Sequence, residues 1–154
     1  MSDKGRGALF NALGDIEGLT VLDTFAGSGA LAIEAISRGA KDAVAIEADK
    51  SAHGVIIHNT QTLGIGDQVK AVRAFMRAWS TRNQALLFDL VFADPPYDAL
   101  PYRDLKSLPR HLKDGGTLVL SWPGKAEPLK FDGLTSVQTK SYGDAQLVFY
   151  QKIS

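Results

Sequence analysis

The stretch LTVLDTFAGSGALA, residues 19–32, decides the fold class of this chain. Its first five residues are an apolar run that ends in Asp23, as is typical of a buried strand. Gly27 and Gly29 then allow a tight turn and a close approach of a ligand to the backbone, and Ala32 is small enough for close packing of a helix on the strand. The stretch fits the pattern G-x-G-x-x-G/A and predicts a strand, a glycine turn and a helix whose N-terminus offers free N–H groups.

The chain on both sides of this stretch alternates between strand and helix patterns. We expect a helix over residues 3–14, with Ser2 or Asp3 as its N-cap. The expected strands cover residues 19–23, 42–47, 69–73, 87–93 and 117–122, and the expected helices cover residues 30–38, 50–63, a basic segment after 73, and 102–113, the last ending at Gly115-Gly116. Two alternating runs, residues 135–140 and 146–152, follow as an antiparallel pair. This order predicts an α/β fold: a Rossmann-like, doubly wound, mostly parallel sheet with an antiparallel C-terminal strand pair.

Length and composition limit the class of protein. The chain has 154 residues, with 17 Lys and Arg, 17 Asp and Glu and no cysteine, which predicts one domain over residues 1–154 without disulfides or thiolate metal sites. The three histidines lack metal-ligand spacing, so we expect no metal. Because no long apolar run and no signal-peptide pattern are present, we expect a cytoplasmic protein that contacts no membrane. The net charge of zero argues against a general binder of polyanions.

Acidic residues near the glycine turn indicate the kind of ligand. Glu47 ends the second expected strand, where a carboxylate can accept hydrogen bonds from both hydroxyls of a ribose and would repel a 2′-phosphate. Asp23 precedes the turn, where an anion disfavours a pyrophosphate and favours a cation. S-adenosylmethionine carries an ammonium and a sulfonium and no phosphate, so we prefer it to a nicotinamide dinucleotide. A packing turn that binds no ligand is the remaining alternative.

The motif Asp94-Pro95-Pro96-Tyr97 follows the fourth expected strand, which lies beside the first strand in this topology. The prolines remove two backbone donors, so the Asp94 carboxylate and a backbone carbonyl remain as acceptors, and Tyr97 adds a flat surface for stacking. Such acceptors suit a planar NH₂ group. By holding its hydrogens they favour a pyramidal nitrogen with a localised lone pair, which can attack the methyl group of a sulfonium in line. The alternative is that Asp94-Pro95 only begins a turn.

At these residues the sequence resembles a class I S-adenosylmethionine-dependent methyltransferase, and more closely the RsmD type of bacterial 16S ribosomal RNA guanine-N2 methyltransferase. The resemblance covers nearly the whole chain and rests on SDKGRGALFNAL (2–13), LDTFAGSGAL (22–31), EAISRGA (34–40) and FADPPY (92–97). It implies methylation of the exocyclic N2 of a guanine, at position 966 of 16S ribosomal RNA in that family, on RNA or on a small-subunit assembly intermediate. Methylation of another nucleic-acid amino group, such as adenine N6, and a cofactor-binding module without activity stay open. We expect a monomer.

The resemblance also implies roles for individual residues. The target base would meet Asp94, Pro95, Pro96 and Tyr97, which we take as catalytic. The cofactor would meet Asp23, Phe25, Ala26, Gly27, Ser28, Gly29, Glu47, Ala48, Asp49, Arg73, Ala74, Phe75 and Asp94. Arg6 and Phe10 are expected at the edge of the cofactor, and the expected RNA contacts are Arg6, Arg103, Lys106 and Arg110, although solvated helix faces are the alternative for these cations.

Three features depart from the pattern of that family. A basic, β-rich segment that helps to grip RNA would precede Ser2, and it is absent from this sequence. An acid that reaches the adenine amino group is common after the third strand, but here the chain reads Arg73-Ala74-Phe75-Met76, so we expect that acceptor to be lost and Phe75 to pack on adenine. Gly5 stands in the first helix where an aliphatic residue is usual.

Overall fold

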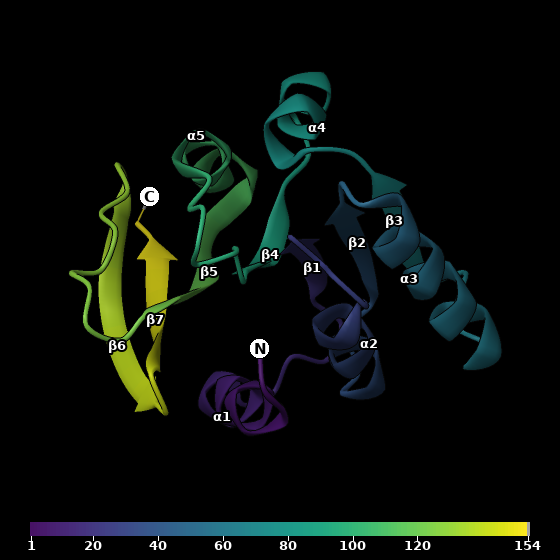
Figure 1. Ribbon diagram of the computed structural model, residues 1–154, viewed down its shortest axis with the longest axis horizontal. Coiled ribbons are helices and arrows are strands. Elements are labelled where there is room, and N and C mark those ends of the chain that lie inside the picture. Colours follow the sequence, from purple (N-terminus) through teal and green to yellow (C-terminus); the bar gives the residue numbers. More distant parts are fainter. Residues whose placement is uncertain (154) are drawn as a thin grey trace.

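The computed structural model describes residues 1–153. Seven strands form one sheet in the order β3-β2-β1-β4-β5-β7-β6. The strands are β1 (Thr20–Thr24), β2 (Asp42–Glu47), β3 (Val69–Arg73), β4 (Phe88–Ala93), β5 (Leu112–Pro123), β6 (Leu134–Tyr142) and β7 (Ala145–Lys152). The helices are α1 (Asp3–Leu13), α2 (Ala30–Ser37), α3 (Lys50–Thr62), α4 (Met76–Arg82), α5 (Tyr102–Lys106) and the 3₁₀ helix η1 (Leu108–His111). Figure 1 shows this order across the molecule.

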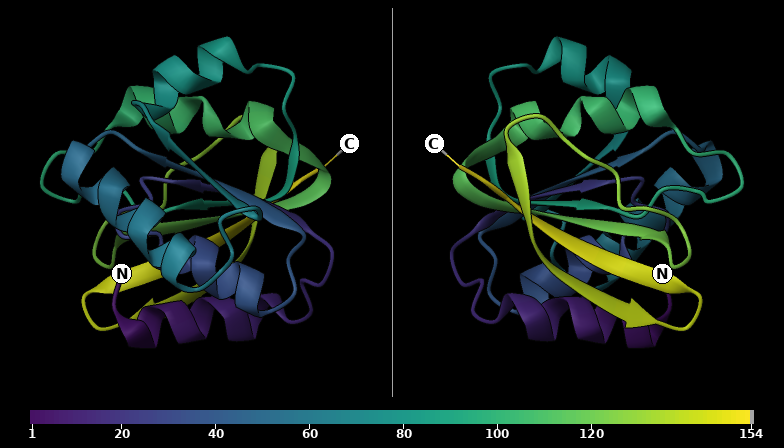
Figure 2. Two further views of the ribbon diagram at one scale, coloured as in Figure 1. Left: turned by 90° about the vertical axis from the view of Figure 1, so that its right-hand side faces the viewer. Right: turned by 90° about the vertical axis from the view of Figure 1, so that its left-hand side faces the viewer.

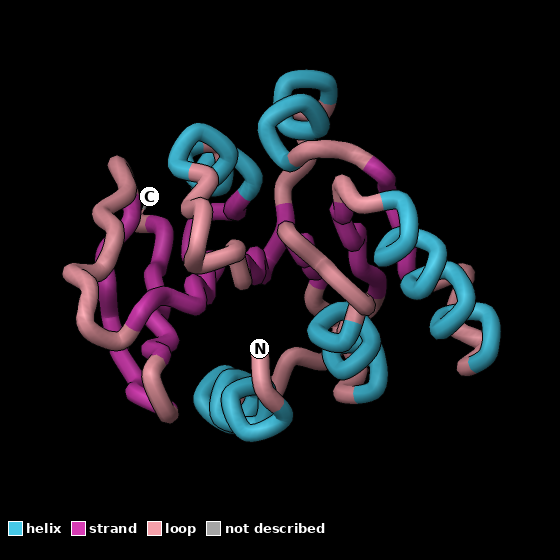
Figure 3. Tube along the Cα trace, in the orientation of Figure 1, coloured by secondary structure: helices cyan, strands magenta, loops and turns pink. Residues whose placement is uncertain are grey.

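The first five strands run parallel, and β7 pairs antiparallel with both β5 and β6. Helices α1, α2 and α3 cover one face of the sheet, and α4 and α5 cover the other, as the side views in Figure 2 and the tube in Figure 3 show. The predicted α/β fold with an antiparallel C-terminal strand pair is therefore confirmed. The strand order reverses between β1 and β4, and ligands bind at this switch point in open α/β sheets.

The starts of helices α1 and α3 are set by side-chain caps. The Ser2 hydroxyl accepts a hydrogen bond from Gly5 N at 3.1 Å, so Ser2 is the N-cap of α1. Asp49 accepts from Ala52 N at 2.9 Å and caps α3 in the same way.

The predicted helix over residues 102–113 is wrong in its second half. α5 ends at Lys106, and η1 follows with Pro109 near its start, because proline removes a backbone donor and disfavours continuation of the helix. Gly115 and Gly116 do not end a helix but lie inside β5, which begins at Leu112 and shifts register against β4. A Cβ at Gly116 would lie 2.9 Å from the Asp89 carbonyl oxygen, so the close approach of the two strands requires glycine there.

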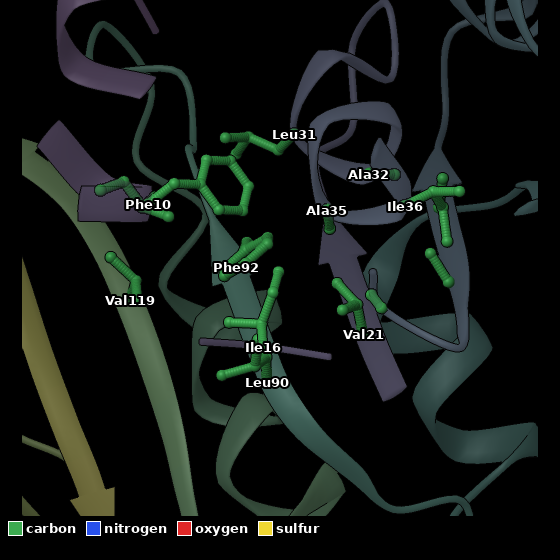
Figure 4. Close-up of a cluster of buried hydrophobic side chains, with 14 of the residues drawn as sticks. Phe10, Ile16, Val21, Leu31, Ala32, Ala35, Ile36, Leu90, Phe92 and Val119 are labelled. Atoms are coloured by element: carbon green, nitrogen blue, oxygen red, sulfur yellow. The ribbon is translucent and has the colours of Figure 1, made fainter. Parts of the chain in front are cut away.

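The core on the α1–α3 face packs around Phe92 and Phe10, whose ring centroids are 5.7 Å apart at an interplanar angle of 86°. Figure 4 shows Leu31 and Val119 beside this pair. Phe10 is only 1% exposed, so burial of this one side chain contributes about 1.5–3 kcal/mol. Within residues 1–153, no helix has the length and hydropathy needed to cross a membrane.

Candidate active site

The carboxyl ends of β1 and β4 lie side by side, because Asp23 pairs with Phe92 and Thr24 pairs with Ala93. The glycine turn leaves β1, and the Asp94–Tyr97 loop leaves β4. Two sequence motifs that lie about 70 positions apart in the chain therefore meet at one edge of the sheet.

A first cavity of about 460 Å³ opens at this edge. Most of its lining residues are hydrophobic, and its three charged side chains are all carboxylates. The lining residues are Phe25, Ile46, Glu47, Ala48, Ala74, Phe75, Met76, Asp94, Pro96, Pro101 and Asp104.

The glycine turn is held in left-handed conformations. Phe25, Gly27 and Gly29 have φ of 55°, 58° and 82°, and the Phe25 value is unusual for a residue with a side chain. A hydrogen bond of 2.8 Å from Ala26 N to the carbonyl oxygen of Ile46 fixes this turn against β2. The space that a Cβ of Gly27 would occupy has no atom within 4 Å, so the backbone of the turn is open to a ligand.

Glu47 connects the glycine turn with the end of β2. Its Oε1 accepts from Gly27 N and its Oε2 accepts from Asp49 N, both at 2.8 Å. Each oxygen keeps a second lone pair, and the residue lines the first cavity. The carboxylate is therefore held in one orientation at the cavity edge and can accept further hydrogen bonds there.

The sequence had led us to expect Asp23 to be open to the cleft. In the structure its side chain is buried instead. Its side chain is 1% exposed, Oδ2 accepts a 3.3 Å hydrogen bond from Ala32 N, and Oδ1 has no partner among the described residues. Burial raises the pKa of Asp23 to about 8, and the nearby carboxylates of Asp94 and Glu47 add to the shift. A buried oxygen without a partner costs free energy that a cationic ligand would recover.

A second cavity of about 780 Å³ lies on the other side of the Asp94 loop. It shares Asp94 and Pro96 with the first cavity. The Asp94 Oδ2 atom accepts a 2.7 Å hydrogen bond from the amino group of Met1. The lining residues are Met1, Ser2, Asp94, Pro95, Pro96, Tyr97, Asp98, Ser121, Tyr142, Gly143, Asp144 and Ala145.

Three hydroxyl groups form a chain in the second cavity. Ser121 Oγ lies within hydrogen-bond distance of Tyr97 Oη at 2.5 Å and of Tyr142 Oη at 3.1 Å. Burial raises the pKa of Tyr97 to about 12 and also raises the pKa of Tyr142, so both phenols stay neutral near pH 7. The Tyr97 ring is thus held at its hydroxyl end while 39% of the residue stays exposed.

The presence of glycine at position 5 has a local reason beside the second cavity. A Cβ at Gly5 would lie 2.5 Å from Cε2 and 2.8 Å from Cζ of Tyr142. Any larger residue at position 5 would therefore displace the Tyr142 ring. The glycine makes room for the Tyr142 ring.

The remaining predicted residues lie in different places. Arg73 is the last residue of β3 and lines neither cavity, whereas Phe75 follows the strand and lines the first cavity with 71% of the residue exposed. Phe10 is packed in the core instead of at a ligand edge. Arg6 pairs with Asp3 and Glu34 on the α1–α2 surface and lines neither of the two cavities. The cations Arg103, Lys106 and Arg110 are exposed on α5 and η1.

Several residues of the site carried no signal in the sequence. Ser121 and Tyr142 come to the second cavity through the pairing of β5, β6 and β7. Asp104 comes to the first cavity on α5. Of these, only Asp104 could have been suspected, because it is the acidic residue in the first turn of the helix that follows the Asp94–Tyr97 loop.

The first cavity and the glycine turn beside it fit S-adenosylmethionine on the chemistry of their residues. The open backbone at Gly27, the unpartnered Asp23 oxygen and the fixed Glu47 carboxylate suit an amino acid, a cation and a ribose. The hydrophobic walls suit a purine. Within residues 1–153, no group of three or more His, Cys, Asp and Glu side chains is placed to hold a metal ion.

Known proteins are similar to this chain in sequence and in fold. A family model described as "Conserved hypothetical protein 95" matches residues 1–151. The chain is 28% identical over 158 residues to "Putative rRNA methyltransferase YlbH" of Bacillus subtilis, with 98% of this chain and 86% of that protein covered. It is 37% identical over 97 residues to "Ribosomal RNA small subunit methyltransferase D" of Escherichia coli, and this match covers 62% of the chain and 48%, about half, of the relative.

A solved structure extends this similarity to the whole fold. "Putative methyltransferase yhhF from Escherichia coli" superposes with a TM-score of 0.86 at 28% identity, covering 99% of this chain and 87% of that one. Sequence and fold agree over nearly all of residues 1–153. The chain therefore belongs to the Conserved hypothetical protein 95 family, the RsmD type of class I S-adenosylmethionine-dependent methyltransferases.

Proposed function

We propose that the chain transfers a methyl group from S-adenosylmethionine to the exocyclic N2 of a guanine in 16S ribosomal RNA. The observation that carries the proposal is the wall of Asp94 and Pro96, which lines two neighbouring cavities. A methyl donor in the first cavity and a base in the second would meet beside Asp94 and Pro96, where the two cavities adjoin. The names of the relatives agree with an RNA substrate of the small ribosomal subunit.

The glycine turn, Asp23 and the residues of the first cavity would each contact a different part of the cofactor. The glycine turn would hold its amino-acid part, with Asp23 as the counterion of its ammonium, and Glu47 would accept from the ribose hydroxyls. Ala48 also lines the first cavity, whereas Asp49 caps α3, and Ala26 and Ser28 are part of the glycine turn. Bound in this way, the cofactor supplies an electrophilic methyl group on a sulfonium.

The residues of the second cavity prepare the amino group that is methylated. Asp94 and a backbone carbonyl of the Pro95-Pro96 segment accept the two hydrogens of N2, which localises the nitrogen lone pair. Asp94 stabilises the positive charge that develops on N2, and Asp94 or water then takes the proton. Tyr97, fixed by Ser121, offers its ring face to the base. The neutral phenol is a hydrogen-bonding and stacking group, because its raised pKa excludes a role as base near pH 7.

A guanine N2 inside a paired helix cannot reach this wall. The base must be unstacked or flipped out, so the substrate is a loop or an assembly intermediate with an accessible guanine. The exposed cations of α5 and η1 lie on the segment that follows the Asp94–Tyr97 loop and would meet phosphates next to the target base.

Nucleoside mass analysis of small-subunit RNA, incubated with the protein and S-adenosylmethionine, tests the proposal. We expect N2-methylguanosine with the wild-type protein and with the exposed control variant Asp114→Ala. With Asp94→Ala we expect a loss of transfer on the order of 100-fold or more, while the affinity for S-adenosylhomocysteine changes little. N6-methyladenosine as product would refute the guanine assignment. Absence of transfer at saturating cofactor would refute the enzymatic activity and leave a cofactor-binding module.

A further inference from the structure

Asp104 is the charged residue of the first cavity to which the proposed function gives no task. The other two carboxylates have tasks, since Glu47 faces a ribose and Asp94 forms the wall to the second cavity. Side-chain hydrogen-bond donors are absent among the described lining residues of this cavity. Asp104 is therefore a third acceptor that is available to a ligand group that donates.

Asp104 is held in a defined orientation by a contact between two helices. Its Oδ1 atom accepts a 2.7 Å hydrogen bond from Arg77 N, in the first turn of α4. The N-cap position of α4 is Phe75, whose side chain cannot cap, so Asp104 caps this helix from α5. The second oxygen, Oδ2, accepts no hydrogen bond from the described part of the chain, and the residue is half-buried at the cavity.

The surroundings of Asp104 match the edge of a purine. It shares the cavity with Ile46, Phe75 and Met76, which offer apolar surface for the faces of a ring. Adenine differs from unsubstituted purine by an exocyclic NH₂ group, which donates hydrogen bonds and needs an acceptor. The segment Arg73–Met76 brings no carboxylate to this place, so α5 provides the acceptor that the sequence after β3 lacks.

We propose that Asp104 accepts a hydrogen bond from the amino group of the cofactor's adenine and so determines the preference for adenine. This inference rests on the proposed function and adds a specificity-determining residue to its cofactor site. Phe75 and Met76 pack against the ring. Asp104 accepts a hydrogen bond from its amino group and also caps the N-terminus of α4. One carboxylate thus couples the position of a helix to recognition of the base.

The test compares two ligands by calorimetry on the full chain. S-adenosylhomocysteine carries the amino group, and the analogue with unsubstituted purine as base lacks it. The variant Asp104→Asn keeps an oxygen for Arg77 N but presents NH₂ in place of Oδ2, so it retains the cap and opposes the adenine amino group. Asp114→Asn, an exposed change in β5, is the matched control.

We expect the wild-type protein and the control to prefer S-adenosylhomocysteine by on the order of 10-fold or more. In Asp104→Asn the preference should vanish or reverse, with the affinity for the purine analogue and the melting temperature of the free protein nearly unchanged. Equal losses for both ligands, or a retained preference, would overturn the role of Asp104. If Asp104→Asn fails to fold, the ratio of the two affinities in the wild-type protein decides. A wild-type protein that binds both ligands equally well would also overturn the role of Asp104. A wild-type protein that binds neither ligand refutes the proposed function instead.

Discussion

Replacing Asp23 with Asn should make the protein more stable at pH 8 and should weaken its binding of the cofactor. The Asp23 carboxyl is buried with one oxygen unpartnered, and burial raises its pKa to about 8 from 3.8. The native state therefore keeps a proton that the unfolded chain releases above about pH 4. Asn is neutral at every pH and can still accept from Ala32 N through its amide oxygen.

The magnitude follows from the size of the pKa shift. Because the native pKa is raised, the unfolded state binds fewer protons than the native state between about pH 4 and pH 8, so the free energy of unfolding falls as the pH rises through this window. Each pKa unit corresponds to about 1.4 kcal/mol, which gives an upper bound on the order of 4 kcal/mol at pH 7. At roughly 2–4 °C per kcal/mol for a chain of this size, Asp23→Asn should raise the melting temperature by up to roughly 8–16 °C near pH 7.

Urea unfolding of wild type and Asp23→Asn from pH 4 to pH 9 measures this difference. The two curves should meet near pH 4 and separate as the pH rises, whereas the exposed control Asp114→Asn should follow the wild type. His111, whose pKa is lowered mainly by burial, reduces stability as the pH falls below its unfolded pKa, but it does so in all three proteins and cancels from the comparison. Parallel curves for wild type and Asp23→Asn would refute the reasoning.

Calorimetry in buffers of different ionisation enthalpy should show that cofactor binding at pH 7 releases a proton from the wild type and not from Asp23→Asn.

Three further outcomes are expected. Gly29→Ala should lose about 1–2 kcal/mol in urea unfolding, because Gly29 has φ of 82° and a Cβ would lie 3.2 Å from a side chain of α3; unchanged stability would contradict this. Gly5→Ala should raise the KM for RNA more than Tyr142→Phe does, since the added Cβ would displace the whole ring while Phe loses only a hydroxyl; steady-state kinetics with equal values for both would count against the packing argument. The double variant Arg103→Ala and Lys106→Ala should lower the slope of log affinity for RNA against log salt by about 1–2, and an unchanged slope in filter binding would remove these cations from the interface.

Much of the fold could be predicted from the sequence because its strands carry local signals. Apolar runs that end at Asp23, Glu47 and Ala93 predicted three adjacent parallel strands, and the switch-point rule then placed their ends together. The helix over residues 102–113 failed because Gly115-Gly116 fits either a helix end or a bulge. Contact with Asp89 decided between the two, and this contact is a tertiary one.

The site was predictable only where its residues sit at strand ends. Glu47 and Asp94 lie at the ends of strands and at the cavities, whereas the positions of Ser121 and Tyr142 depend on the register of three C-terminal strands. The burial of Asp23 was also out of reach, because a carboxyl at the end of a strand looks alike in sequence whether it faces solvent or a closed interior. Its enclosure becomes visible only with the contact to Ala32.

The order of the last strands has a consequence for synthesis. β6 pairs with β7, and β7 connects it to β5 in the sheet. Tyr142 at the end of β6 can therefore reach its place only after the later residues 145–152 have been inserted between the two strands. During synthesis the residues that line the first cavity therefore all emerge before those that complete the second.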